Sequence, residues 1–159
     1  MRLFLRTWQL SLLIATVACG MGLQSCSHDG MPKLYQVKGK ILLDGNPAPD
    51  ATVVFEPIRT SKSDFARPGN AYTDKDGNFT AWTLREGDGL PAGRFRVAII
   101  SQVQVGGPVL NEMSTTADYN RVVWEWKVPQ KYADPATSGI EVEVTRSGMK
   151  PEVIELSSK

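Results

Sequence analysis

Hydrophobic and polar side chains alternate along most of the chain after residue 34, and this period-two pattern is typical of strands with one buried face. The clearest alternating runs cover residues 35–43, 53–55, 95–99, 124–128, 140–144 and 153–156. No segment of this part combines a 3.6-residue period with helix caps. The pattern predicts an all-β fold, with residues 34–159 forming a single antiparallel β-sandwich of seven to eight strands.

Glycine and proline lie between the runs, where they favour turns. Asp44-Gly45 and Asp76-Gly77 are hairpin signals, because glycine readily adopts the positive φ that such turns require. Two longer segments, 59–70 and 102–120, lack alternation. Long loops of this kind are often either functional or disordered. Residues 102–120 are therefore either a recognition loop or an irregular connection between sheets.

The N-terminus has the layout of a secretory signal. Arg2 and Arg6 precede an apolar run of roughly a dozen residues, with no acidic residue before position 26. This run is shorter than the about 20 residues that span a bilayer. A permanent anchor helix is the alternative, and the polar residues that follow Leu23 argue against it. We expect residues 1–25 to be a signal peptide.

The apolar run ends in Leu23-Gln24-Ser25-Cys26, which resembles a bacterial lipobox. The resemblance implies a lipid on Cys26 and cleavage just before it; Cys19 is a poorer match. One cysteine then remains, and acylation accounts for it. Residues 26–33 would form a tether. We expect an exported lipoprotein of the cell envelope, held at a membrane through Cys26, with Ser27 favouring the outer membrane.

Cleavage would also change the charge balance. Removal of Arg2 and Arg6 takes the 18 basic residues to 16, against 17 acidic ones. A nearly neutral, mixed chain lacks the basic patch that recognises nucleic acid. We therefore expect no nucleic-acid partner.

Several motifs occur in an order that resembles the carboxypeptidase regulatory-like domains, which belong with the transthyretin-like and Cna-B-like sandwiches. The motifs are Val37-x-Gly39-x-Ile41, Asp44-Gly45-Asn46-Pro47, Ala51-x-Val53-x-Phe55-x-Pro57, Thr73-Asp74-x-Asp76-Gly77-x-Phe79 and Gly93-x-Phe95-x-Val97. The resemblance covers most of residues 35–157. It implies a transthyretin- or Ig-like sandwich that serves in adhesion, spacing or partner binding, and it supplies no catalytic residues.

Residues suited to catalysis or zinc binding are scarce. His28 is the only histidine and lies in the tether, where it cannot be held beside a nucleophile. Zinc sites of the usual His and Cys type lack ligands. Glu125, Glu141 and Glu143 lie at polar strand positions, which favours solvated side chains over a carboxylate pair. We expect no enzyme activity and no cofactor.

Asp74, Asp76 and Asp88 are candidates for a calcium site. The segment from Asp74 to Asn78 has some likeness to a calcium loop, yet Gly77 is fourth where an EF-hand loop has glycine sixth. A β-turn with exposed carboxylates is favoured, and no metal is expected.

Trp82, Trp124 and Trp126 are candidate binding residues, because aromatic side chains stack on sugar rings. Trp124 and Trp126 share a strand face with Val128, which favours a core position instead, and Trp82 with Leu84 allows the same interpretation. The leading hypothesis is a non-catalytic module for protein binding or envelope structure. The alternatives are a module that binds envelope polysaccharide and, last, an enzyme that uses only acidic residues.

Overall fold

The structure, a computed structural model, describes residues 32–60 and 67–159. These belong to one compact unit, Met31–Lys159. Cys26, Cys19, His28, the signal segment and residues 26–31 of the tether lie outside the described residues. The strands are β1 (Leu34–Tyr35), β2 (Lys38–Leu43), β3 (Asn46–Pro47), β4 (Thr52–Pro57), β5 (Gly69–Tyr72), β6 (Asn78–Thr80), β7 (Leu90–Pro91), β8 (Gly93–Ile100), β9 (Gln102–Gly106), β10 (Val123–Trp126), β11 (Glu141–Thr145), β12 (Gly148–Lys150) and β13 (Val153–Leu156).

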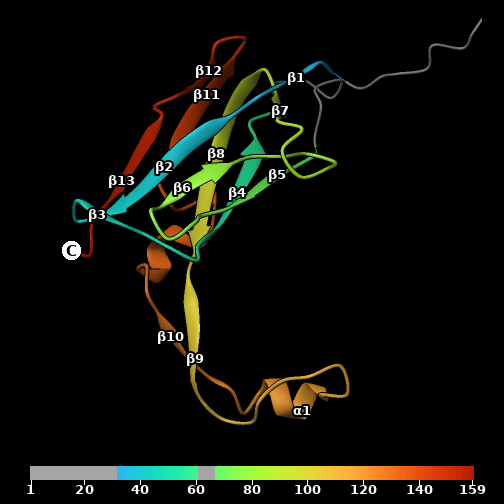
Figure 1. Ribbon diagram of the computed structural model, residues 1–159, viewed down its shortest axis with the longest axis vertical. Helices are drawn as coiled ribbons and strands as arrows, with labels where there is room; N and C mark the ends of the chain where they lie inside the picture. The colour runs from blue at the N-terminus through green and yellow to red at the C-terminus, as the bar shows by residue number, and fades with distance from the viewer. Residues whose placement is uncertain (1–31, 61–66) are drawn as a thin grey trace, which may run out of the picture. The chain divides into compact units, whose positions relative to one another are not determined.

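Two sheets form the body of this unit, which confirms the predicted all-β, sandwich-like fold (Figure 1). One sheet is antiparallel, with the order β12-β11-β8-β4-β5. The other has β2 at its centre. Strand β13 lies on one side of β2, and β3 and β6 each pair with a different part of β2. Strand β13 runs parallel to β2, from Val153 beside Lys40 to Leu156 beside Leu43. The alternation predicted this strand but not its parallel direction.

The core lies between the inner faces of these sheets. Buried side chains of β4, β8 and β11 form one cluster with those of β2, β6 and β13. The Phe55 ring of β4 lies 5.8 Å from the Phe79 ring of β6 and 6.4 Å from the Phe95 ring of β8, measured between centroids. Phe55 thus joins the two sheets, as expected for large inward aromatics in a small sandwich.

Both predicted hairpin turns are present. Asp44 and Gly45 have φ of 49° and 80°, the two positive values of a turn whose twist matches its strands. Gly77 has φ of 76°, and its N–H donates to the Asp74 carbonyl over 2.9 Å. A Cβ at Gly77 would lie 2.5 Å from the Ile41 carbonyl oxygen, so only glycine fits.

The described parts of the two segments without alternation contain regular structure. Residues 102–120, expected to be a recognition loop or an irregular connection between sheets, contain β9 and a short helix, α1 (Thr116–Tyr119). The segment 59–70 ends inside β5, which begins at Gly69. A 3₁₀ turn, Gln130–Tyr132, follows β10. Neither helical turn reaches the length at which periodicity becomes visible in a sequence.

Thr73 ties two chain segments together inside the fold. Its hydroxyl donates to the Ala48 carbonyl and accepts from the Ala51 N–H, each over 2.8 Å, and its side chain is buried. Thr73→Val would keep the shape and leave both backbone groups without a partner. We expect a loss of about 1–3 kcal/mol in the free energy of unfolding, measured by urea denaturation. Thr73→Ser, which keeps the hydroxyl, should lose less; equal losses would contradict this account.

Candidate functional site

The β9–β10 arm, residues 102–126, is a hairpin whose strands pair only with each other among the described residues. Strand β9 continues from the central strand β8, and Figure 1 shows the arm leading away from the two main sheets. Its base is fixed by the Lys127 N–H, which donates to the Ser101 carbonyl over 2.9 Å, and by the burial of Ser101 and Val128. The arm is therefore an extension of the sandwich.

The far end of the arm is organised by a capping box at the start of α1. The Asp118 carboxylate accepts from the Thr115 N–H over 2.8 Å and from its hydroxyl over 2.7 Å, and it forms an ion pair with Arg121. The Thr115 hydroxyl in turn accepts from the Asp118 N–H. The backbone hydrogen bond from Thr115 is the main cause that lowers the pKa of Asp118 to about 2. The Thr115-x-x-Asp118 spacing is the sequence signal that could have located α1.

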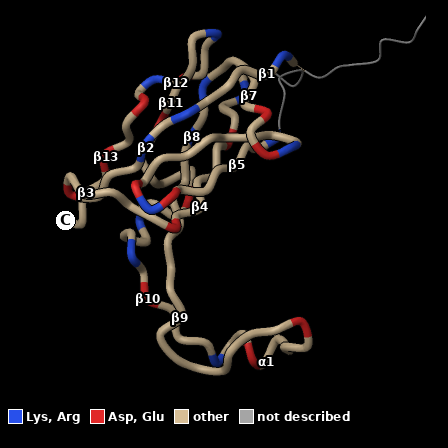
Figure 2. Tube along the Cα trace, in the orientation of Figure 1, with Lys and Arg blue, Asp and Glu red and all other residues tan. Residues whose placement is uncertain are grey.

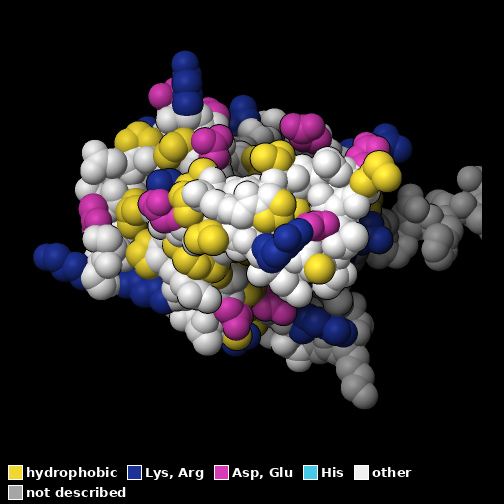
Figure 3. All heavy atoms as spheres, turned by 90° about the horizontal axis from the view of Figure 1, so that it is seen from below, with side chains coloured by type: hydrophobic (Ala, Val, Ile, Leu, Met, Phe, Trp, Pro, Cys, Tyr) yellow, Lys and Arg dark blue, Asp and Glu magenta, His cyan; other side chains and the backbone are white. Residues whose placement is uncertain are grey.

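Exposed hydrophobic side chains are concentrated on the arm. Among the described residues, seven of the ten large hydrophobic side chains that are exposed belong to it: Val103, Val105, Val109, Met113, Tyr119, Val123 and Trp124. Figure 2 shows few charged residues along this part of the chain, and Figure 3, seen from below, shows hydrophobic side chains open to solvent. Exposed apolar side chains that are concentrated on one extension of the fold make it a candidate interaction site.

Trp124 lies on this arm and is 45% exposed, so its interpretation as a core residue is wrong. Val128 on the same predicted face is buried, and Trp126 is half-buried. The reason is that β10 ends at Trp126 and, in the part of the chain that the structure describes, pairs with β9 alone, outside the two main sheets. Trp124 and Trp126 lie beside Gln104 and Gln102, their partners across the hairpin.

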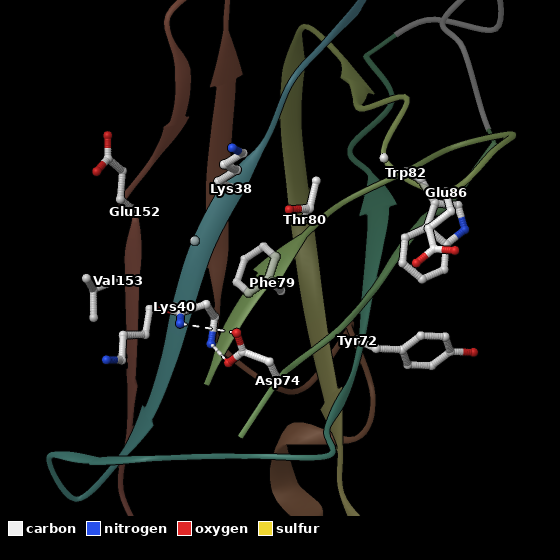
Figure 4. Close-up of a pocket in the computed structure, with 13 residues that line it drawn as sticks. Lys38, Lys40, Tyr72, Asp74, Phe79, Thr80, Trp82, Glu86, Glu152 and Val153 are labelled. Atoms are coloured by element: carbon white, nitrogen blue, oxygen red, sulfur yellow. Dashed lines mark hydrogen bonds between the residues drawn. The ribbon is translucent and has the colours of Figure 1, made fainter. Parts of the chain in front are cut away.

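A second surface feature is a groove of about 710 Å³ over the outer face of β2 and β6. Figure 4 shows Tyr72 and Trp82 on one side of it, with Lys38, Lys40 and Glu152 towards the other. Trp82 also packs against the core, whereas Leu84 is exposed, so the core interpretation is wrong for Leu84. The structure therefore separates the three candidate tryptophans: Trp82 lines the groove, and Trp124 and Trp126 belong to the arm.

Tyr72 is a groove residue that sequence analysis missed. Its ring centroid lies 5.3 Å from that of Trp82, at an interplanar angle of 56°. The signal was the alternation of Asn70, Ala71 and Tyr72, in which buried Ala71 separates two residues of the opposite face. The run was too short to stand out beside the longer strands.

The three candidate calcium ligands do not form a site. Asp74 accepts from the backbone N–H groups of Asp76 and Asn78 over 2.9 and 2.8 Å, and the Asn78 hydrogen bond is the main cause that lowers its pKa. Asp88 accepts from the N–H groups of Thr83, Leu84 and Arg85. In residues 32–60 and 67–159, no group of three or more His, Cys, Asp or Glu side chains is placed to hold a metal ion. Asp74 and Asp88 instead organise their own turns.

No helix in the described part of the chain is long and apolar enough to cross a membrane. Comparison with known proteins found no matching family model, no similar curated protein and no similar solved structure.

Proposed function

We propose that this protein is an exported lipoprotein, attached to a membrane through Cys26, whose non-catalytic sandwich presents the β9–β10 arm to a protein of the cell envelope. The observation that carries the proposal is the concentration of exposed apolar side chains on the arm. A two-stranded hairpin is marginally stable alone in water. This arm keeps its apolar surface outward, which is the arrangement of a surface that a partner covers.

The chemistry of the arm favours a protein surface over a lipid surface. Segments that lie on membranes are rich in lysine and arginine. Residues 102–126 contain one such residue, Arg121, and it is paired with Asp118. An arm with few basic residues and many exposed apolar side chains fits a partner with an apolar recognition surface.

The edges of the arm suggest how the partner is held. Strands β9 and β10 each have one neighbour among the described residues, so each keeps one edge free for another strand. An added strand would contribute backbone hydrogen bonds, while the apolar side chains of the arm would contribute specificity. A hollow of about 560 Å³ at the base, lined by Pro47, Pro49 and Val103, would extend the contact.

The resemblance to carboxypeptidase regulatory-like domains supports a binding role, because that family offers no shared catalytic residues. Asp74 and Asp88, whose carboxylates accept hydrogen bonds from the backbone of their own turns, support the same conclusion. We therefore assign Asp74 and Asp88 to folding.

Site-specific photo-cross-linking in cells tests the arm directly. A photoreactive residue at Val105, which is exposed on β9, should cross-link to one recurrent envelope protein, identified after capture on a tag placed after Lys159. The same residue at Glu155, which is exposed on β13, is the control and should not give that product. Cross-linking to lipid alone, or the same product from both positions, would contradict the proposal.

Trp124→Ser should reduce co-capture of this partner by about tenfold or more, because exposed aromatic anchors dominate interface energetics. Leu84→Ser is the matched control, since Leu84 is an apolar residue of nearly equal exposure away from the arm. Both variants should keep the far-ultraviolet circular dichroism of the parent. Equal co-capture by the two variants would exclude the arm as the binding surface.

A further inference from the structure

The groove over β2 and β6 is separate from the arm and has a different chemistry. It is open, has a volume of about 710 Å³, and is lined by aromatic, cationic, anionic and hydroxyl side chains. Volumes of about 300–1,000 Å³ are usual for small-ligand sites. The groove therefore has the capacity for a ligand, and its lining indicates the class.

One side of the groove is an aromatic pair that the backbone holds in place. Trp82 and Asn70 exchange two backbone hydrogen bonds of 2.8 Å, which fix Trp82 to β5. Asn70 is two residues before Tyr72 in this strand. The Trp82 side chain rests on the core, and Tyr72, at 64% exposed, contacts Trp82 and otherwise faces water. Because Trp82 is fixed and Tyr72 packs against it, the two rings are already in place before a ligand binds. Binding would therefore cost little conformational entropy at these side chains.

The segment after Trp82 is equally fixed. Asp88 accepts from three successive N–H groups, at Thr83, Leu84 and Arg85, and the Thr83 hydroxyl donates to the Gly89 carbonyl over 2.7 Å. This turn places Glu86 on the groove beside Trp82 (Figure 4). The aromatic side thus has its own acceptor group.

The remaining lining supplies hydrogen-bonding groups of both kinds. Lys38 and Lys40 are donors on β2, Glu152 is an acceptor before β13, and Thr80 on β6 is both. The cations Lys38 and Lys40 and the carboxylates Asp74, Glu86 and Glu152 leave no single sign of charge in the groove. Single-stranded nucleic acid requires a positively charged groove beside its aromatic platforms, so this lining excludes it.

We propose that this groove binds a carbohydrate chain. The apolar faces of sugar rings would stack on Tyr72 and Trp82, while their hydroxyls, which both donate and accept, would pair with Lys38, Glu86 and Glu152. Neutral ligands with many hydroxyls fit a lining that carries charges of both signs. The proposal does not rest on the function of the arm, because the two surfaces share no lining residue.

The test is a titration of the whole protein with linear oligosaccharides, in which tryptophan fluorescence and calorimetry measure binding. The probes are chitohexaose, cellohexaose, xylohexaose and maltohexaose. We expect saturable binding of at least one, and a loss of about tenfold in affinity for Tyr72→Ala, about 1.4 kcal/mol. Absence of saturable binding to all four would overturn the proposal.

Tyr119→Ala is the matched control, because Tyr119 is an exposed tyrosine on the arm, at 54%. It should bind the oligosaccharide as the parent does, and so should Trp124→Ser. If Tyr72→Ala binds unchanged, or if both tyrosine variants lose binding equally, the groove is not the site. Failure of partner capture by the arm would leave these results unaffected, so the two proposals are tested separately.

Discussion

Phe55→Ala is expected to lower the free energy of unfolding by about 3–5 kcal/mol, the usual cost of removing a buried phenylalanine ring. The ring is fully buried and lies within 5.8 Å of Phe79 and 6.4 Å of Phe95 between centroids, so its loss opens a cavity between the sheets. Because small domains have a total stability of about 5–15 kcal/mol, this change removes a large part of it. Urea denaturation monitored by circular dichroism measures the effect.

Two controls accompany that measurement. Phe55→Leu, which fills most of the space, should lose distinctly less than Phe55→Ala. Val123→Ala removes an exposed side chain of the arm and should change the free energy of unfolding by no more than about 0.5 kcal/mol. A loss below 1 kcal/mol for Phe55→Ala would show that the sheets do not pack through this ring.

Cys26→Ser is expected to move the protein from the membrane fraction to the soluble fraction and to abolish its labelling by fatty acid. Each buried CH₂ of a lipid chain contributes about 0.8 kcal/mol to membrane binding, and two chains give stable attachment. Loss of both chains should therefore release the protein from the membrane. Fractionation and metabolic labelling with a fatty-acid analogue measure it.

Cys19→Ser is the control for this variant, because Cys19 lies inside the apolar run and is a poorer lipobox match. Its labelling should equal that of the parent. Labelling that persists in Cys26→Ser and disappears in Cys19→Ser would place the lipid on Cys19 and contradict the prediction. Labelling that persists in both variants would exclude either cysteine as the single site of lipidation.

Local physical preferences made most strands visible in the sequence. Buried residues of β4, β11 and β13 alternate with more exposed ones, as expected when one face of a strand is buried. The turns at Asp44-Gly45 and Asp76-Gly77 follow from the positive φ values that glycine tolerates. These strands and turns depend on residues that are close together in the chain, so they can be predicted from a single sequence.

The arm shows where that reasoning ends. Trp124 and Val128 occupy equivalent places in one alternating run, yet Val128 is buried and Trp124 is exposed. Alternation states which residues share a face, and it cannot state whether another layer covers that face. The answer depends on where the sandwich ends, which is a property of all its strands together.

The groove gives the same lesson. Trp82 was visible as a candidate, but its pairing with Tyr72 depends on the hydrogen bonds between Trp82 and Asn70, which bring a segment after β6 against β5. The parallel pairing of β13 with β2 likewise joins distant parts of the chain. The sequence by itself determined the longer strands, the two hairpin turns and the fold class, since these rest on local periodicity and backbone preference. Only the tertiary structure decided which side chains are exposed and which meet, because those depend on contacts between residues far apart in the chain.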